Sequence, residues 1–207
     1  MWRYTKYGIP YKIRLCLDLK AADVNEATAP WKFKYRGLDD VAKSVKRGDW
    51  LASVDISRFY LRLPAGRNLR RVQWVQDPLS YAKTSKANNR SKRKLWRQLQ
   101  AIGFGLKTAP AWASVVSAEL VRILQADGVR VVGCFLDDIL IAGRSQKECQ
   151  AALDKAIKIM AELSIPANEK TVPPQSPDKG IVFLGVHIRT SSLFQRSTKN
   201  MQLIASA

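Results

Sequence analysis

Three aspartates stand beside strongly apolar segments of the sequence. Asp55 lies one residue before the end of the segment WLASVDI, and Asp137 and Asp138 separate two apolar runs in the stretch CFLDDILIAG. A lone Asp-Asp pair between strands is usually a turn, because Asp suits turn positions. Here both flanks are apolar, so the pair would place like charges beside a buried sheet, which is unfavourable unless cations bind there. The pattern leaves a turn and a metal site both open.

Magnesium is the cation that such a site would suit. Mg²⁺ takes oxygen ligands, typically one or two carboxylates together with substrate phosphates. Two such ions about 4 Å apart activate a 3′-hydroxyl and stabilise a leaving pyrophosphate. Combined with a basic surface, the paired acids indicate phosphoryl transfer on a nucleic acid.

The elements around these aspartates predict an α+β fold with a mostly antiparallel sheet. The two apolar runs that flank Asp137 and Asp138 form a predicted hairpin. Apolar periodicity and capping residues predict helices, and alternation or short apolar runs predict strands. The predicted strands cover residues 13–19, 50–56, 71–76, 129–135, 139–142 and 181–188, and the predicted helices cover residues 38–47, 109–124 and 145–163.

The charge is strongly positive and unevenly distributed. The 207 residues carry 35 Lys and Arg against 17 Asp and Glu, a net charge of +18. Residues 1–100 hold 23 basic and 8 acidic residues, a net +15, whereas residues 101–207 hold 12 and 9, a net +3. A merely soluble surface mixes both signs, so the expected partner is a polyanion such as nucleic acid. Trp74 and Trp96 interleave with these cations and could stack on bases, although core packing is the commoner fate of such rings.

Composition excludes several classes of protein. With 46% apolar residues and six Trp, the chain can bury a core and is not disordered as a whole. No run approaches the roughly 20 apolar residues that span a bilayer, and the N-terminus lacks the apolar region of a secretory signal, so no membrane partner is expected. Three widely spaced cysteines favour a reducing intracellular compartment (nucleus, cytoplasm or organelle) over a disulfide framework or a zinc site. The single histidine, His187, argues against histidine-based metal sites.

Six short blocks, in order over about residues 12–188, resemble the reverse transcriptases of retroelements, specifically the DIRS-like and related retrotransposon group. The blocks are KIRLCLDLK at 12–20 followed by Asn25, GDWLASVDISRFY at 48–60, GFGLKTAP at 103–110, FLDD at 135–138, NEK at 168–170 and FLG at 183–185. The resemblance implies a right-hand polymerase palm, an antiparallel sheet with helices on one face, together with partial fingers and no thumb.

The resemblance also implies catalytic roles for the residues that match the family's metal-binding and proton-donating positions. Asp55 and Asp137, with Asp138 beside them, would hold two Mg²⁺ or Mn²⁺ ions, and the backbone carbonyl of Ile56 would complete the coordination. Lys170 would protonate the departing pyrophosphate as a general acid.

Substrate contacts follow from the same resemblance. Arg14, with Lys12 beside it, would bind the triphosphate, since cationic donors suit phosphate oxygens. Tyr60 would be the steric gate against a ribose 2′-hydroxyl, and Gly105 would permit close backbone approach to the substrate. The residues assigned to nucleic-acid contact are Lys83, Lys86, Arg90, Lys92, Arg93, Lys94, Arg97, Phe183 and Gly185.

The implied domain order alternates between fingers and palm. Residues 1–54 would form the N-terminal part of the fingers and the strand that enters the palm, and residues 55–66 the catalytic strand. Residues 67–107 would be fingers with a basic insertion at 83–97, residues 108–188 palm, and residues 189–207 a truncated tail.

Two interpretations of function remain. The first is the fingers–palm portion of an RNA-directed DNA polymerase that uses an RNA template and deoxynucleoside triphosphates, either encoded as a fragment or completed by another chain. The three aspartates favour it. The second is a retroelement-derived, inactive subunit that binds structural RNA in a ribonucleoprotein such as an organellar ribosome. The basic insertion, the bulky Phe59 before Tyr60 and the missing thumb favour the second. An RNA-templated RNA polymerase is a third possibility, against which Tyr60 argues.

Overall fold

The computed structural model describes residues 3–4, 10–12, 17–20, 23–29, 31–33, 35, 37–76 and 96–191. The chain forms two compact units, one of Met1–Trp31 with Tyr60–Ala109 and one of Lys32–Phe59 with Pro110–Ala207. The predicted division into fingers and palm stays a prediction.

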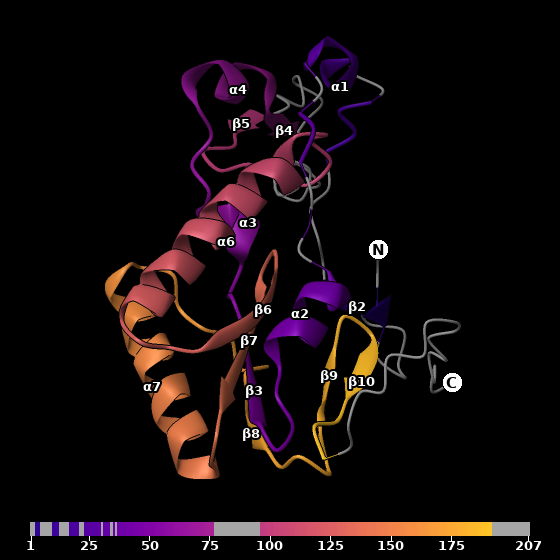
Figure 1. The fold of residues 1–207 in the computed structure, drawn as a ribbon. Helices are drawn as coiled ribbons and strands as arrows, with labels where there is room; N and C mark the ends of the chain where they lie inside the picture. The colour runs from indigo at the N-terminus through magenta and orange to yellow at the C-terminus, as the bar shows by residue number, and fades with distance from the viewer. Residues whose placement is uncertain are drawn as a thin grey trace, which may run out of the picture. The chain divides into compact units, whose positions relative to one another are not determined.

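The second unit is built on a four-stranded antiparallel sheet in the order β6-β7-β3-β8 (Figure 1). The strands are β3 (Trp50–Asp55), β6 (Val131–Phe135), β7 (Asp138–Gly143) and β8 (Val172–Gln175). The β6–β7 pairing confirms the predicted hairpin. Strand β8 was not predicted, because its sequence VPPQ contains two prolines, which sheets tolerate only where ladder hydrogen bonds are dispensable, as on this edge.

The second unit also contains helix α7 (Gln146–Glu162) and, from Pro110 on, helix α6 (Ala109–Ala126). Helix α7 packs on β3 and β7 against the face that carries the fully buried Val54, Ile139 and Ile141. Gly143 allows the close approach: a Cβ there would lie 2.5 Å from the backbone nitrogen of Cys149. Burial, followed by nearby negative charge, raises the pKa of the Cys149 thiol to about 11, so it acts as a packing residue.

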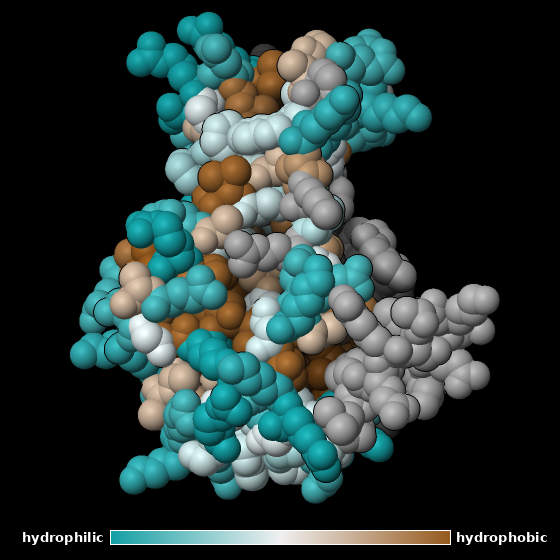
Figure 2. All heavy atoms as spheres, in the orientation of Figure 1, coloured by the Kyte–Doolittle hydropathy of each residue, from teal (hydrophilic) through white to brown (hydrophobic). Residues whose placement is uncertain are grey.

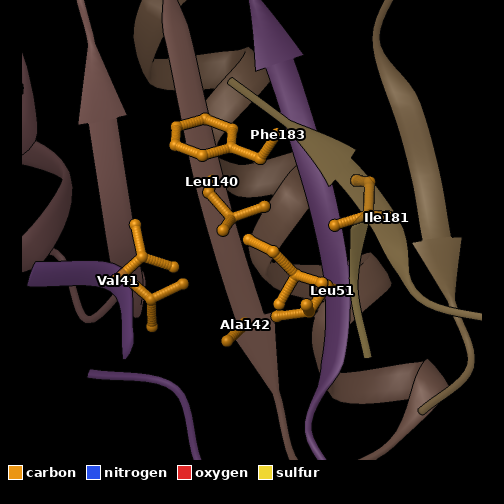
Figure 3. Packing of buried hydrophobic residues seen from close by; sticks show 8 residues of the cluster. Val41, Leu51, Leu140, Ala142, Ile181 and Phe183 are labelled. Atoms are coloured by element: carbon orange, nitrogen blue, oxygen red, sulfur yellow. The ribbon is translucent and has the colours of Figure 1, made fainter. Parts of the chain in front are cut away.

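Helix α2 (Leu38–Ser44) and the hairpin of β9 (Ile181–Phe183) and β10 (Val186–Ile188) cover the other face. Their side chains meet Leu51 and Leu140 of the sheet in one hydrophobic cluster (Figure 3). The full cluster of buried residues is Val41, Leu51, Val132, Leu140, Ala142, Ile181, Phe183 and Ile188.

The prediction of one strand over residues 181–188 was wrong. Leu184 and Gly185 have φ of 52° and 77°, and these left-handed conformations turn the chain into a hairpin. The block FLG is therefore the end of a strand and a turn.

The first unit consists of short elements. They are β1 (Arg3–Tyr4), β2 (Pro10–Lys12), α1 (Val24–Ala27), α4 (Arg67–Val72), β4 (Trp74–Gln76) and β5 (Trp96–Gln98), with α3 (Phe59–Arg62) starting at its boundary. The predicted strand at 71–76 is correct only from Trp74 on, since Arg71 and Val72 end α4. Residues 13–16 of the predicted strand 13–19 lie outside the described residues, and Leu17–Leu19 form no strand.

Local signals placed the helices well. Ser145 caps α7 by accepting a hydrogen bond from the backbone of Glu148, as the capping-box pattern predicts. Helix α2 ends at Ser44, three residues earlier than predicted, and α6 extends two residues further.

On the face drawn in Figure 2, hydrophilic side chains cover most of the described surface and hydrophobic ones show in small patches. In the part of the chain that the structure describes, no helix has the length and apolar character needed to cross a membrane.

Candidate active site

The backbone brings the three predicted aspartates to one end of the sheet in the second unit. Asp55, the last residue of β3, lies directly opposite Asp138, the first residue of β7. Residues opposite each other in an antiparallel pair share a face, with Cβ atoms about 4.5–5.5 Å apart. Asp137 precedes Asp138 in the hairpin turn, and its carbonyl accepts a 2.8 Å hydrogen bond from the backbone N–H of Ile56. Strand register thus places acids distant in sequence side by side.

The electrostatics of Asp138 reflect this crowding. Burial, and after it the negative charges of Asp137 and Asp55, raise the pKa of Asp138 to about 6, while the positive charge of Lys170 acts in the opposite direction. Like charges placed opposite each other on a sheet are destabilising unless something neutralises them. A cation bound among the three carboxylates would relieve the repulsion.

Replacing Asp138 by Asn should stabilise the protein at pH 8 in the presence of EDTA. The pKa of Asp138 is higher in the folded protein, about 6, than the ordinary value of 3.8, so the ionised carboxylate opposes folding above this window. Because the side chain is partly exposed, we expect a modest rise in Tm of about 2–4 °C. The gain should shrink as the pH falls from 6 towards 4, because Asp138 becomes protonated in the folded protein over this window.

Thermal unfolding from pH 4 to pH 8 measures this effect. Asp154→Asn is the matched control, because Asp154 is an exposed aspartate of α7 that accepts a hydrogen bond from Gln150. A gain that does not depend on pH, or one shared by the control, would contradict the prediction.

The segment after α7 runs along the end of β3 and carries Lys170. Ser57 N–H donates to the carbonyl of Pro166 at 3.0 Å, and Asn168 N–H donates to the carbonyl of Asp55 at 2.7 Å. These two hydrogen bonds hold residues 166–168 beside the end of β3. Lys170 follows two residues later, close enough for its charge to influence Asp138.

The predicted backbone ligand, Ile56, lies inside this arrangement. Ile56 is buried and faces Ala167 in an isolated antiparallel bridge. The two hydrogen bonds of that bridge come from the flanking residues, so its formation does not engage the Ile56 carbonyl.

The donor set suits a hard divalent ion. It consists of carboxylate and peptide oxygens, which are the ligands that Mg²⁺ prefers. Burial, followed by the charges of Asp137 and Asp55, raises the pKa of Asp138, and a nearby cation would act in the opposite direction. Among the residues that the structure describes, no three His, Cys, Asp or Glu side chains are already grouped closely enough to hold a metal. The backbone therefore places the donors in one neighbourhood without setting their coordination geometry.

Comparison with known proteins identifies the family. The family described as reverse transcriptase (RNA-dependent DNA polymerase) matches residues 5–188. The chain belongs to this family. A foamy viral protease–reverse transcriptase, solved in complex with double-stranded DNA, has a similar structure, with a TM-score of 0.67 and 16% sequence identity over 92% of this chain.

That likeness establishes the fold of the domain. The mixed helices and antiparallel sheet confirm the predicted α+β class of a reverse transcriptase domain. The alignment spans 29% of the foamy viral chain. None of the curated proteins matches this chain significantly.

In this reverse transcriptase domain, Phe59, the residue before the predicted steric gate, faces inward. Arg58, three residues after the end of β3, is exposed and has a left-handed φ of 52°, whereas Phe59 is only 3% exposed. The Phe59 side chain is thus buried in the interior. It no longer argues against a nucleotide site.

The predicted nucleotide-contacting residues of the first unit are held by local contacts. The Tyr60 ring packs on Phe104 with centroids 5.1 Å apart. Gly105 has a φ of 105°, and a Cβ there would lie 2.1 Å from the carbonyl oxygen of Leu17. Glycine is therefore required by the chain's own backbone, and Asn25 adds a 2.9 Å hydrogen bond to the Gly105 carbonyl.

Burial corrects the prediction for Phe183. Its side chain is 3% exposed within the hydrophobic cluster, so it is not available to nucleic acid, whereas the adjacent Val182 is 66% exposed.

Gly185 lies in the β9–β10 turn with open space around it. Arg97 is exposed on β5, and Lys12 is described only as backbone in β2. The assignments that lie outside the described residues are Arg14, Lys83, Lys86, Arg90, Lys92, Arg93 and Lys94.

An exposed aromatic surface lies on the ribbon of β4 and β5, which we call the tryptophan ribbon and which carries one cation, Arg97. Trp74 and Trp96 are 49% and 56% exposed. Trp96 pairs with residue 76, two positions along from Trp74, so both rings start from one face of the ribbon. Residues 60–76 and 96–109 of the same unit contain no acid, and their cations are Arg62, Arg67, Arg70, Arg71, Arg97 and Lys107.

Proposed function

We propose that this chain carries out template-directed nucleotidyl transfer as an RNA-directed DNA polymerase. The observation that carries the proposal is the register that sets Asp55 opposite Asp138, with Asp137 in the adjoining turn. Membership of the reverse transcriptase family supports it. The alternative of an inactive RNA-binding subunit rested in part on Phe59, and the burial of that residue removes this argument.

The roles of the site residues follow from their positions. When bound, two Mg²⁺ or Mn²⁺ ions would supply Lewis-acid activation of the primer 3′-hydroxyl and stabilise the charge on the leaving pyrophosphate. Asp55, Asp137 and the Ile56 carbonyl would hold them, with Asp138 balancing the remaining charge. Lys170 would deliver a proton to the pyrophosphate oxygen, as its position beside this site supports.

Substrate selection is assigned to the first unit. We propose that Arg14 and Lys12 bind the triphosphate and that the ring of Tyr60 excludes a ribose 2′-hydroxyl. Tyr60 is suited to this role because its contact with Phe104 restricts its orientation. The expected partners are an RNA template and deoxynucleoside triphosphates.

Primer extension on an RNA template with deoxynucleoside triphosphates and Mg²⁺ or Mn²⁺ tests the proposal. The full 207-residue chain should extend the primer, and EDTA should stop extension. Ribonucleoside triphosphates should be used much less well. RNA binding without any extension under either ion would overturn the proposal in favour of the RNA-binding subunit.

The tryptophan ribbon should contribute to binding of single-stranded RNA by stacking. Base–aromatic stacking is worth about 1–3 kcal/mol per base, so Trp74→Ala and Trp96→Ala should each weaken binding by about tenfold. Trp74→Phe and Trp96→Phe keep a ring and should restore most of the affinity. Fluorescence anisotropy over a range of salt concentrations measures this.

The salt dependence separates stacking from charge. Because counterion release depends on the cations, the slope of log affinity against log salt should stay the same in the alanine variants. Equal affinities for the wild type and both alanine variants would contradict the prediction.

A further inference from the structure

A hydroxyl of α6 reaches the turn that carries Asp137. Ser117 is 2% exposed, and its Oγ lies 2.5 Å from the carbonyl oxygen of Leu136 and 2.8 Å from that of Ala113, one turn earlier in the helix. A serine hydroxyl has one proton to donate. The Ala113 carbonyl already lies within the hydrogen-bonded helix α6. We therefore assign the hydroxyl proton to the shorter contact, the one with the carbonyl of Leu136, which lies 19 residues away in an irregular turn.

The turn itself is conformationally unusual. Leu136 has a φ of 53°, a left-handed conformation that a branched side chain rarely adopts, so surrounding contacts must hold it. A cavity of about 100 Å³ beside the turn is lined by α6 and the hairpin, Ser117 and Leu136 included. Packing on that side is therefore incomplete, and the hydrogen bond from Ser117 links α6 to the turn at the edge of this cavity, which Tyr35 and Ser114 also line.

The two carbonyls on either side of the Asp137 Cα are both held. The Leu136 carbonyl accepts from Ser117, and the Asp137 carbonyl accepts from the backbone of Ile56 at 2.8 Å. Each bond fixes the plane of one peptide group, because a peptide unit is rigid. With both flanking planes fixed, the direction of the Asp137 Cα–Cβ bond is fixed as well.

We propose that Ser117 is a positioning residue that aims the Asp137 carboxylate at the reacting centre. The inference rests on the proposed polymerase function and goes beyond it, since Ser117 itself touches neither substrate nor metal in this role. Its effect should therefore appear in the chemical step. Binding of the nucleotide, which the first unit is proposed to supply, should be spared.

The chain offers a matched control for this role. Ser114 lies on the same helix, three residues earlier, and its Oγ donates to the carbonyl of Pro110 at 2.8 Å, the same contact to the residue four positions back that Ser117 makes with Ala113. Ser114→Ala therefore removes a helical serine hydroxyl without removing a bond to the turn. Ser117→Thr keeps the hydroxyl, and its extra methyl group can use the neighbouring cavity.

The test compares Ser117→Ala, Ser117→Thr and Ser114→Ala with the wild type in primer extension. A displacement of a reacting group by about 1 Å can cost about 100-fold, so we expect kcat of Ser117→Ala to fall by about 10- to 100-fold. KM for the nucleotide should stay within about twofold, as expected when an interaction acts on the chemical step. Ser117→Thr should recover most of the loss, and Ser114→Ala should match the wild type.

Hydrogen exchange gives a second readout that needs no activity. Backbone amides at 136–138 should exchange faster in Ser117→Ala than in Ser114→Ala. Tm should fall modestly in Ser117→Ala, because the Leu136 carbonyl loses a hydrogen-bond partner. If the wild type extends primers and Ser117→Ala equals Ser114→Ala in kcat and exchange, the positioning role is wrong and the polymerase stands. If the wild type itself fails to extend, the proposed function falls and this role falls with it.

Discussion

Replacing Asp137 by asparagine should lower primer extension by about a thousandfold or more while leaving the fold intact. Asparagine keeps the size of the side chain but removes the negative charge that would hold the ions. Losing about 4 kcal/mol of transition-state stabilisation corresponds to about a thousandfold in rate. The backbone contact of Asp137 with Ile56 survives the substitution, so the hairpin turn should keep its conformation.

Extension rates with Mg²⁺ and Mn²⁺, together with Tm, measure the effect. Asp154→Asn serves again as the control, because it removes a carboxylate from the exposed surface of α7. RNA affinity should hardly change in either variant, since phosphate contacts come from cations. Extension by Asp137→Asn within tenfold of the wild type would mean that Asp137 is no metal ligand.

Replacing Arg130 by methionine should destabilise the protein more than any other single change considered for the second unit. Asp49 is fully buried, and both of its carboxylate oxygens accept hydrogen bonds of 2.8 Å from the Arg130 guanidinium. Arg130 also donates to the carbonyl of Ser44, and the Asp49 carbonyl accepts from Thr190. The pair thus connects the end of α2, the start of β3 and the chain after β10.

Removing the arginine would leave a buried, unpaired carboxylate. Breaking such a pair costs about 3–5 kcal/mol, and because Arg130 is partly exposed we expect about 3 kcal/mol, or about 6–12 °C in Tm. Arg122→Met is the matched control: Arg122 pairs with Glu119 on the exposed surface of α6, and its loss should leave Tm almost unchanged. Denaturant unfolding of both variants measures the difference.

The pH dependence of the loss has a definite sign. Burial acts to raise the pKa of Asp49, but the hydrogen bonds from Arg130 and from the backbone of Lys46 outweigh it and hold the pKa below its ordinary value of 3.8. A lowered pKa means that the carboxylate stabilises the fold above that value and that this contribution is lost as the pH falls through the folded value. In Arg130→Met the effect of burial on the pKa of Asp49 is no longer offset by the arginine, so that pKa should rise. The difference between the wild type and Arg130→Met should therefore be largest at pH 8 and shrink as the pH falls through the raised pKa of Asp49 in the variant. A Tm loss equal to that of Arg122→Met would show that the pair contributes no net stability.

Local patterns were sufficient for the hairpin and the long helices. The apolar runs around Asp137 and Asp138 predicted β6 and β7, and the capping box at Ser145 predicted the start of α7. Such signals depend on residues a few positions apart, which interact in the same way wherever the element packs.

These local patterns did not predict which side chains point into the interior. Phe183 and Val182 are neighbours in a short apolar strand, and one is buried while the other is exposed. The alternation of a strand assigns them to opposite faces, but only the packing of the β9–β10 hairpin on the sheet decides which face is inside. The same holds for Ser117, whose sequence position shows a helical serine and not the turn that it contacts.

The sequence by itself determined that this chain carries a strand ending at Asp55, a hairpin bearing Asp137 and Asp138, and a strongly basic N-terminal half. Only the tertiary structure decided that Asp55 stands opposite Asp138 and that the segment leading to Lys170 runs beside them. The physical reason is that strand register is set by contacts between residues far apart in the chain. Those contacts exist only once the helices and the β9–β10 hairpin have closed both faces of the sheet.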